Sequence, residues 1–196
     1  MPVAIEQLAA HHQRQGFDCG EPVLNEFLER QAGQLSCKGF GKTYVALGTD
    51  GLVVTGFANL SAGPVKTPHL PASLKLPRYP APILRMGRLA VDRRAQGQGT
   101  GRQLLSFALQ LPLEFSKNVG LYTVVVDAKH DKAMVYYQTM GFTPTLDDPL
   151  CLYLPVSVLE KAKSLPWSHG LSLRSHLKLV TDTTELAGDD LSPLKI

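Results

Sequence analysis

A cluster of glycines between residues 94 and 101 is the part of this sequence best suited to chemistry. The run Arg94-Ala95-Gln96-Gly97-Gln98-Gly99-Thr100-Gly101 joins a strand-like segment to a helical pattern. Glycines let backbone N–H groups approach a ligand closely, and a helix start carries about half a positive charge. We therefore expect the loop to bind an anion, and a diphosphate suits it.

Two well-known phosphate loops do not fit this spacing. A Walker loop requires Gly-Lys followed by Ser or Thr, which Thr100-Gly101-Arg102 does not supply. A dinucleotide fingerprint requires a third glycine three residues after the second, and Gly97, Gly99 and Gly101 are spaced differently. The remaining pattern is Arg/Gln-x-x-Gly-x-Gly directly after a strand.

Basic residues gather around this loop, although the formal charge of the whole chain is only +3. Such an excess suits a phosphate-bearing partner. The alternative is a solvated surface whose arginines pair with Asp18, Glu21, Glu26 and Glu29, and the charge pattern leaves both open. Between residues 66 and 102, a single acid, Asp92, stands against Lys66, Lys75, Arg78, Arg85, Arg88, Arg93, Arg94 and Arg102.

The first half of the chain predicts one helix, a hairpin and a long loop. A helix is expected over 24–35, where apolar residues fall on one face. Strands over 42–47 and 52–61 flank a turn at 49–51. The density of proline over 63–82 predicts a long surface loop, because proline is excluded from helix interiors and central strands.

The second half predicts a crossover unit. A strand over 83–91 leads through the glycine loop into a helix that Pro112 should kink or end. A strand over 121–126 and a helix over 131–140, closed by Gly141, come next, and short strands over 143–145 and 151–154 complete the pattern. Strand, helix and strand in this order require a parallel pair, so the class is α+β, or mixed α/β.

Length and composition indicate one ordinary folded domain with a short appendage. The chain has 196 residues, 44% hydrophobic and 19% charged. The three cysteines, Cys19, Cys37 and Cys151, lack metal-ligand spacing, so we expect reduced thiols. No export signal or apolar span of about 18 residues is visible, which predicts a soluble cytoplasmic protein without membrane contact.

The glycine loop and its flanks resemble the GNAT (GCN5-related N-acetyltransferase) family over roughly residues 17–155. Gly87-Arg88-Leu89-Ala90-Val91-Asp92 precedes the loop, and Tyr137-Gln138 with Gly141-Phe142 ends the later helix. The resemblance implies a mostly antiparallel mixed sheet with a splayed parallel strand pair, flanked by helices, and acetyl-CoA as cofactor. It assigns the coenzyme to Leu89, Ala90, Val91, Arg94, Gln96, Gly97, Gln98, Gly99, Thr100, Gly101 and Arg102.

Further motifs are similar to the GNAT toxins of bacterial toxin–antitoxin modules. These are Phe17-Asp18-Cys19-Gly20, the segment 56–63, Tyr79-Pro80-Ala81-Pro82 and the segment 124–128. Such toxins acetylate the α-amino group of aminoacyl-tRNA. The resemblance therefore implies aminoacyl-tRNA as the acceptor and a small DNA-binding antitoxin as a partner, and a homodimer is also possible. Acetylation of a small amine, amino acid or protein amine remains an alternative, as does coenzyme binding without turnover.

The resemblance also assigns residue roles. Tyr137 takes the place of the general acid that protonates the departing thiolate, and Tyr136 is expected in the core. No resident base is expected, because an α-amino group has a pKa near 7.7 against ~10.4 for lysine. Asp92 and Asp127 are expected to cap or pin loops.

The basic residues divide into two expected groups. Arg85 and Arg88 can share a strand face only through a bulge, because their separation is odd. With Lys66, Lys75 and Arg78, they are candidates for the acceptor-stem phosphates, whereas Arg93, Arg94 and Arg102 are assigned to coenzyme A.

No metal site is expected. His130 is expected to be a solvated residue at a helix entry, and the other histidines lack acidic partners at ligand spacing. They are His11, His12, His69, His169 and His176.

The domain is expected to span 1–162. A C-terminal extension of unknown role is expected over 163–196, where the chain past residue 164 suggests a helix and a loosely attached tail.

Overall fold

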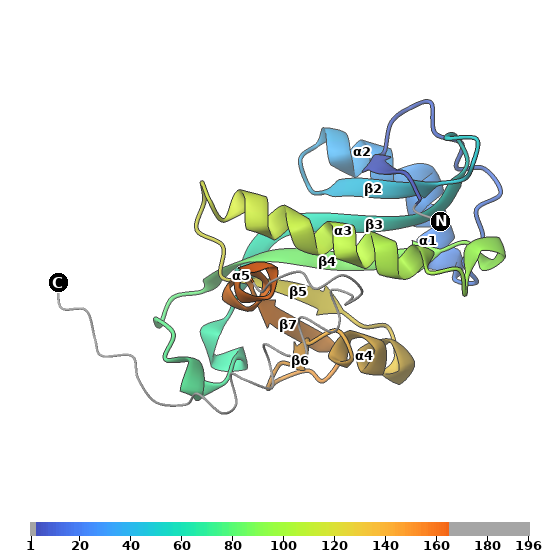
Figure 1. The fold of residues 1–196 in the computed structure, drawn as a ribbon. Coiled ribbons are helices and arrows are strands. Elements are labelled where there is room, and N and C mark those ends of the chain that lie inside the picture. Colours follow the sequence, from blue (N-terminus) through green and yellow to red (C-terminus); the bar gives the residue numbers. More distant parts are fainter. Residues whose placement is uncertain (1–2, 165–196) are drawn as a thin grey trace.

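The computed structural model describes residues 3–164, which form a seven-stranded sheet in the order β1-β2-β3-β4-β5-β7-β6 (Figure 1). Every neighbouring pair is antiparallel except β4 and β5. The expected mixed sheet with one parallel pair is confirmed. The strands are β1 (Ile5–Gln7), β2 (Lys42–Leu47), β3 (Val54–Val65), β4 (Ala81–Val91), β5 (Thr123–Asp127), β6 (Thr143–Pro144) and β7 (Cys151–Pro155).

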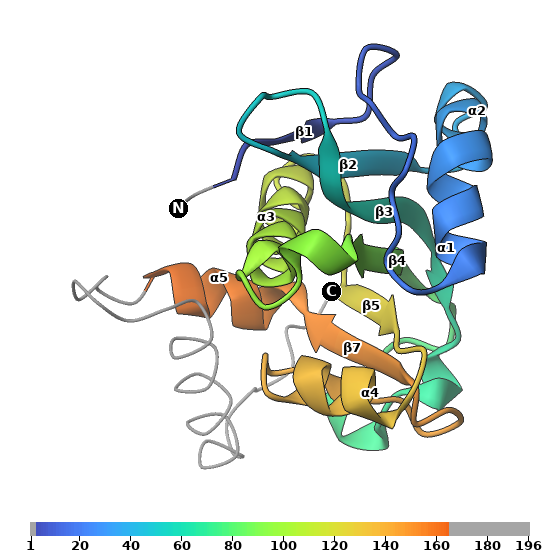
Figure 2. The same cartoon turned by 90° about the vertical axis from the view of Figure 1, so that its right-hand side faces the viewer.

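Helices cover both faces of the sheet. α1 (Pro22–Glu26), a π-helical turn (Phe27–Gln31) and α2 (Ala32–Cys37) form one helical stretch on one face. α3 (Thr100–Phe115) lies on the other face, as Figure 2 shows. α4 (Asp131–Gln138) follows β5, and α5 (Val156–Ser164) packs beside α3.

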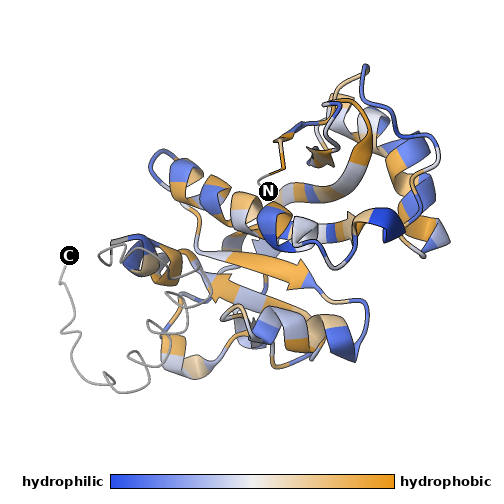
Figure 3. Cartoon of the chain, turned by 45° about the vertical axis from the view of Figure 1, so that its right-hand side comes forward, coloured by the Kyte–Doolittle hydropathy of each residue, from blue (hydrophilic) through white to orange (hydrophobic). Residues whose placement is uncertain are grey.

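Each helical layer has its own core against the sheet. Phe27 packs on Phe57 of β3 with a ring-centroid distance of 5.8 Å, beneath α1 and α2. On the other face, Leu104 and Leu105 of α3 are fully buried against the strands. Figure 3 shows β5 and β7 in the colour of apolar residues, while the helices carry both hydrophilic and apolar residues. Burial of the apolar residues between helices and sheet drives the layers together.

The proline-rich segment is more ordered than the sequence predicts. β3 runs through Pro64 to Val65 and β4 begins at Ala81, so the loop expected over 63–82 shrinks to the residues between them. Two 3-10 helices, Thr67–His69 and Ala72–Leu74, occupy that connection. The pairing of β3 with β2 ends at Leu60, which pairs with Lys42. Beyond Leu60, β3 no longer has β2 beside it and is an edge strand there, and an edge strand tolerates proline at Pro64.

Other expected boundaries also need correction. α3 continues through Pro112 to Phe115, so the proline does not end the helix. Pro112 lies in the last turn, where its missing N–H removes one backbone hydrogen bond near the helix end. β1 and α5 were not predicted, since a three-residue strand is too short to show alternation. The expected boundary at 162 falls inside α5, near its end. The expected helix and tail beyond residue 164 lie outside the described residues.

Candidate active site

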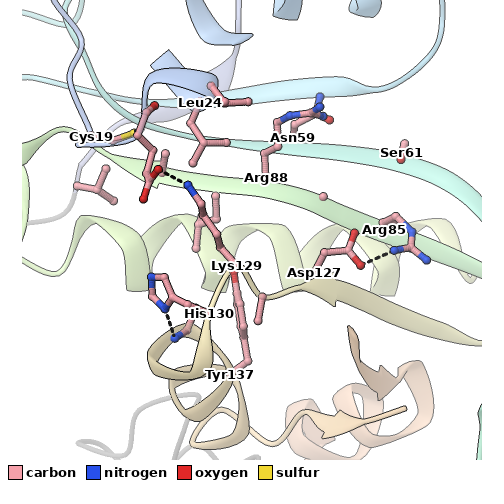
Figure 4. A pocket seen from close by; sticks show the side chains of 18 of the residues that line it. Cys19, Leu24, Asn59, Ser61, Arg85, Arg88, Asp127, Lys129, His130 and Tyr137 are labelled. Atoms are coloured by element: carbon pink, nitrogen blue, oxygen red, sulfur yellow. Dashed lines mark hydrogen bonds and ion pairs between the residues drawn. The ribbon is translucent and has the colours of Figure 1, made fainter. Parts of the chain in front are cut away.

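The two parallel strands separate halfway along β4. Pairing joins Ile83–Met86 of β4 to Thr123–Val126 of β5 and then stops, so 87–91 pairs with no other described strand on that side. This confirms the expected splay. A cavity of about 740 Å³ opens at the separation, between β4, the end of β5, α4 and the α1–α2 layer (Figure 4).

A bulge turns two arginines toward the same cavity. Asn59 of β3 pairs with Arg88 and Leu60 pairs with Met86, so Gly87 is the extra residue of β4. Arg85 and Arg88 therefore both line the cavity, although side chains three residues apart otherwise lie on opposite faces. The sequence made this shared face conditional on a bulge, and the structure has the bulge at Gly87.

The free edge of β4 offers backbone groups to a ligand. The Asp92 N–H donates to the Thr55 carbonyl of β3 at 2.9 Å, and hydrogen bonds alternate along an antiparallel strand. The backbone groups of Leu89 and Val91 therefore point away from β3, toward the opening. The amides of an extended ligand such as pantetheine can pair there as an added strand does.

Asp92 pins the loop that follows β4. Its buried carboxylate accepts from the Arg94 N–H at 2.9 Å and from the Arg94 guanidinium at 2.7 Å, and the Asp18 N–H donates to it at 3.2 Å. The hydrogen bond with the Arg94 side chain is the main reason that the pKa of Asp92 falls to about 2. The guanidinium of Arg94, which the family resemblance assigned to the coenzyme, is thus paired with Asp92, although the Arg94 side chain is 70% exposed. Arg93 likewise pairs with Asp18 at 3.3 Å.

The glycines allow the loop backbone to adopt conformations that other residues disfavour. Gly97 and Gly99 have φ of 76° and 84°, the left-handed region in which a side chain is strained. A Cβ at either position would meet nothing within 4 Å, so the space above them is open to a ligand. Gly99 is the N-cap of α3, whose first amides have no partner within the helix.

The remaining loop residues contribute in different ways. The Thr100 side chain is buried beneath the loop, which leaves only its backbone for a ligand. Arg102 is exposed on the first turn of α3. Gln96 lines the cavity and donates to the Val91 carbonyl at 3.0 Å, while Gln98 donates to the Arg94 carbonyl at 2.8 Å.

Tyr137 reaches the cavity from α4. Its side chain is buried, and this burial, with Tyr136 and Asp127 nearby, raises the pKa of Tyr137 well above its usual value. The hydroxyl therefore stays protonated at neutral pH and can give a proton to a leaving thiolate. The expected burial of Tyr136 is wrong in degree: Tyr136 is half-buried at the edge of the core, and Tyr137 is the buried member of the pair.

Ion pairs unseen in the sequence cross the cavity. Arg85 of β4 pairs with Asp127 at the end of β5 at 2.5 Å, so the carboxylate joins two strands, whereas the sequence predicted that it caps or pins a loop. Glu21 pairs with Lys129 and thereby joins the α1 layer to the segment after β5. The sequence did not predict the Glu21–Lys129 pair, because partners 108 residues apart leave no local pattern.

The basic residues expected to act together are separated. The Arg88 guanidinium lies in the cavity, 4.1 Å from the centre of the Phe27 ring. Lys66 and Arg78 lie outside it, in the connection between β3 and β4.

Two histidines have acidic neighbours that sequence spacing did not indicate. His69 pairs with Asp147 at 2.6 Å, and buried His12 lies 3.4 Å from Glu6, with His11 beside it. The His12 Nδ1 accepts from the Ala9 N–H, so Nε2 carries the proton and has no lone pair for a metal. His130 caps α4 by accepting from the Ala133 N–H at 3.2 Å, as expected of a helix-entry residue.

A family model described as acetyltransferase (GNAT) domain matches residues 39–144, and the chain belongs to this family. The chain is also 35% identical over 151 residues to a tRNA-acetylating toxin of Mycobacterium tuberculosis, across 76% of this chain and 87% of that protein. No helix among residues 3–164 is long and apolar enough to cross a membrane.

Solved structures of toxins share the fold. AtaT complexed with acetyl-methionyl-tRNAfMet is 30% identical with a TM-score of 0.75, covering 81% of this chain and 97% of AtaT. A tyrosine-to-phenylalanine variant of AtaT, bound to the C-terminus of the antitoxin AtaR and to acetyl-CoA, is 27% identical with a TM-score of 0.73, covering 84% and 99%. The AtaT–AtaR complex bound to DNA is 28% identical with a TM-score of 0.68, covering 81% and 97%.

Proposed function

We propose that this protein transfers the acetyl group of acetyl-CoA to the α-amino group of aminoacyl-tRNA and so blocks translation. The observation that carries the proposal is the cavity at the splay, where the free edge of β4 faces Tyr137 and leads to the glycine loop. The 35% identical tRNA-acetylating toxin supports the choice of acceptor.

We place the coenzyme along the cavity and along the glycine loop beside it. Its diphosphate would bind the backbone of 97–101 and the exposed Arg102, and its pantetheine amides would pair with Leu89 and Val91. A β4 backbone N–H would polarise the thioester carbonyl. These assignments use the backbone of the loop more than its side chains, because Thr100 is buried and Arg94 is held by Asp92.

The transfer needs one proton donor and a neutral amine. The amine nitrogen forms a bond to the acetyl carbon, the carbon–sulfur bond breaks, and Tyr137 protonates the thiolate while the amine loses a proton to solvent. An α-amino group is substantially neutral at physiological pH, so no resident base is required.

A transfer assay with Tyr137→Phe tests this function. With labelled acetyl-CoA and charged tRNA, we expect kcat to fall by about 10²–10⁴ because the proton donor is lost. Coenzyme affinity, measured by calorimetry, should stay within about twofold because the backbone contacts remain. Wild-type protein that labels no charged tRNA, but labels a free amine or peptide, would overturn the acceptor.

Cations in the cavity and beyond it would make the RNA contact. We propose that Arg85 and Arg88 bind near the 3′ end and that Lys66 and Arg78 bind phosphates farther along the acceptor stem. The exposed position of Lys66 and Arg78 on the β3–β4 connection supports this division.

Charge removal tests the longer contact. The double substitution Lys66→Gln and Arg78→Gln should raise the KM for charged tRNA several-fold and flatten its salt dependence, because fewer counterions are released. The KM for acetyl-CoA should not change. Lys117→Gln, two residues beyond the end of α3, is the matched control and should leave both constants unaltered.

We also propose a small DNA-binding antitoxin as partner, on the strength of the AtaT–AtaR likeness, and action in the cytoplasm, where charged tRNA is found. Formation of a homodimer stays a prediction. Growth arrest on induced expression, relieved by co-expression of the antitoxin, is the corresponding cellular observation.

A further inference from the structure

One end of the cavity is built from apolar side chains. Val23 and Leu24 of α1, Leu35 of α2 and Phe40 after α2 line it on the side away from α4. Figure 4 shows Leu24 and Tyr137 on opposite sides of the cavity, with Asn59 and Arg88 on the Leu24 side. The apolar wall therefore faces the reacting centre rather than the glycine loop.

The exposure of this wall is unusual within the described residues. Val23 and Phe40 are each 72% exposed, more than any other large hydrophobic side chain in 3–164. Both line this one cavity, whereas Phe115 and Val119, at and beyond the end of α3, line a separate apolar pocket. Exposed apolar side chains that converge on a binding cavity indicate an apolar ligand group.

The polar groups around the wall are already engaged. The Asn59 amide donates to Thr43 Oγ1 at 3.1 Å and to the Lys42 carbonyl at 3.4 Å. The Glu21 carboxylate pairs with Lys129, and the Arg88 guanidinium packs on Phe27. A cationic ligand group entering here would lose water without gaining an unpaired carboxylate among the described residues that line the cavity, because Lys129 already pairs with Glu21 and Arg85 with Asp127, which disfavours it.

We propose that this apolar end is the side-chain subsite of the acceptor and that it selects aminoacyl groups with large apolar side chains. The inference rests on the proposed function and names its substrate class. The aminoacyl side chain would lie against Val23, Leu24, Leu35 and Phe40, with its α-amino group directed toward the thioester near Tyr137.

The test uses one tRNA body charged in turn with methionine, leucine, phenylalanine, glycine, serine and aspartate, so that only the side chain varies. With the full-length protein and labelled acetyl-CoA, kcat/KM for the large apolar groups should exceed that for glycine by about tenfold or more, since each buried methylene adds discrimination. Equal rates, or a preference for glycine or aspartate, would overturn the subsite.

Two variants connect the selectivity to the wall. Val23→Ser and Phe40→Ser should each reduce the ratio of methionyl to glycyl transfer about threefold or more without altering coenzyme affinity; an unchanged ratio contradicts the assignment. Both side chains are largely exposed, so folding should be unaffected. Phe115→Ser is the matched control, which must leave the ratio unchanged. Failure to acetylate any charged tRNA would overturn the acceptor class itself, whereas transfer that ignores the side chain would overturn only the subsite.

Discussion

At the scale of single residues, Asp92 connects the sheet to the coenzyme loop. It is the acid within the basic segment, and three groups converge on its carboxylate: the Arg94 N–H, the Arg94 guanidinium and the Asp18 N–H. Each favours the charged form, which is why its pKa falls. The charge of Asp92 therefore holds the loop in the conformation that exposes its amides.

Asp92→Asn should destabilise the fold in a pH-dependent way. A pKa lowered from 3.8 to about 2 stabilises the folded state above the unfolded pKa, by roughly 2 kcal/mol at pH 7. This contribution disappears as the pH falls from about 4 to 2. Urea unfolding at several pH values should show the difference between wild type and variant narrowing over that range.

The control for this prediction is Glu29→Gln, at an exposed position of the π-helical turn. It should change the free energy of unfolding by less than about 0.5 kcal/mol. A difference between Asp92→Asn and wild type that stays constant down to pH 2 would contradict the charge-based account.

At the scale of elements, the contact of β3 with the start of α3 sets the position of the coenzyme loop. Gly56 of β3 lies beneath the first turn of α3, where a Cβ would be 2.9 Å from Leu104 Cδ1 and 3.1 Å from the Ala90 carbonyl oxygen. Leu104 is fully buried and cannot move aside freely. Glycine at this position lets the helix start approach the sheet.

Gly56→Ala should therefore displace the first turn of α3. We expect a loss of about 1–3 kcal/mol in the free energy of unfolding, as overpacking typically causes, and weaker coenzyme binding because the helix amides shift. Gly63→Ala, farther along β3, meets nothing within 4 Å and should be nearly neutral. Equal effects of the two substitutions, by urea unfolding and calorimetry, would refute this explanation.

At the scale of the whole molecule, α5 closes the layer that contains α3. Leu159 and Ala162 are 2% and 1% exposed and belong to the core beneath α3. We propose that the acetyltransferase domain ends with this helix, near the boundary expected at residue 162.

Leu159→Ala and a truncation after residue 164 test that boundary. Leu159→Ala should cost about 2–5 kcal/mol because it leaves a cavity in the core. The truncated protein should unfold cooperatively, with a loss below about 1 kcal/mol, and keep coenzyme binding. A truncated protein that fails to fold would place residues beyond 164 within the domain.

The sequence by itself determined the features that depend on residues close together in the chain. The glycine loop, the strands, the helix expected over 131–140 and the need for a bulge if Arg85 and Arg88 are to share a face are encoded by neighbouring residues. Together with the family motifs, they predicted the fold and the enzyme class. Proline misled at Pro64 and Pro112, because its effect depends on whether a strand edge or helix end lies near.

Only the tertiary structure decided which distant groups meet. The pairs Arg85–Asp127 and Glu21–Lys129, and the acidic neighbours of His12 and His69, depend on the path of the chain. The same is true of the apolar wall at Val23 and Phe40, which α1 and α2 bring to the splayed strands. Periodicity determines which face of an element is apolar, but the packing of layers determines what that face encloses.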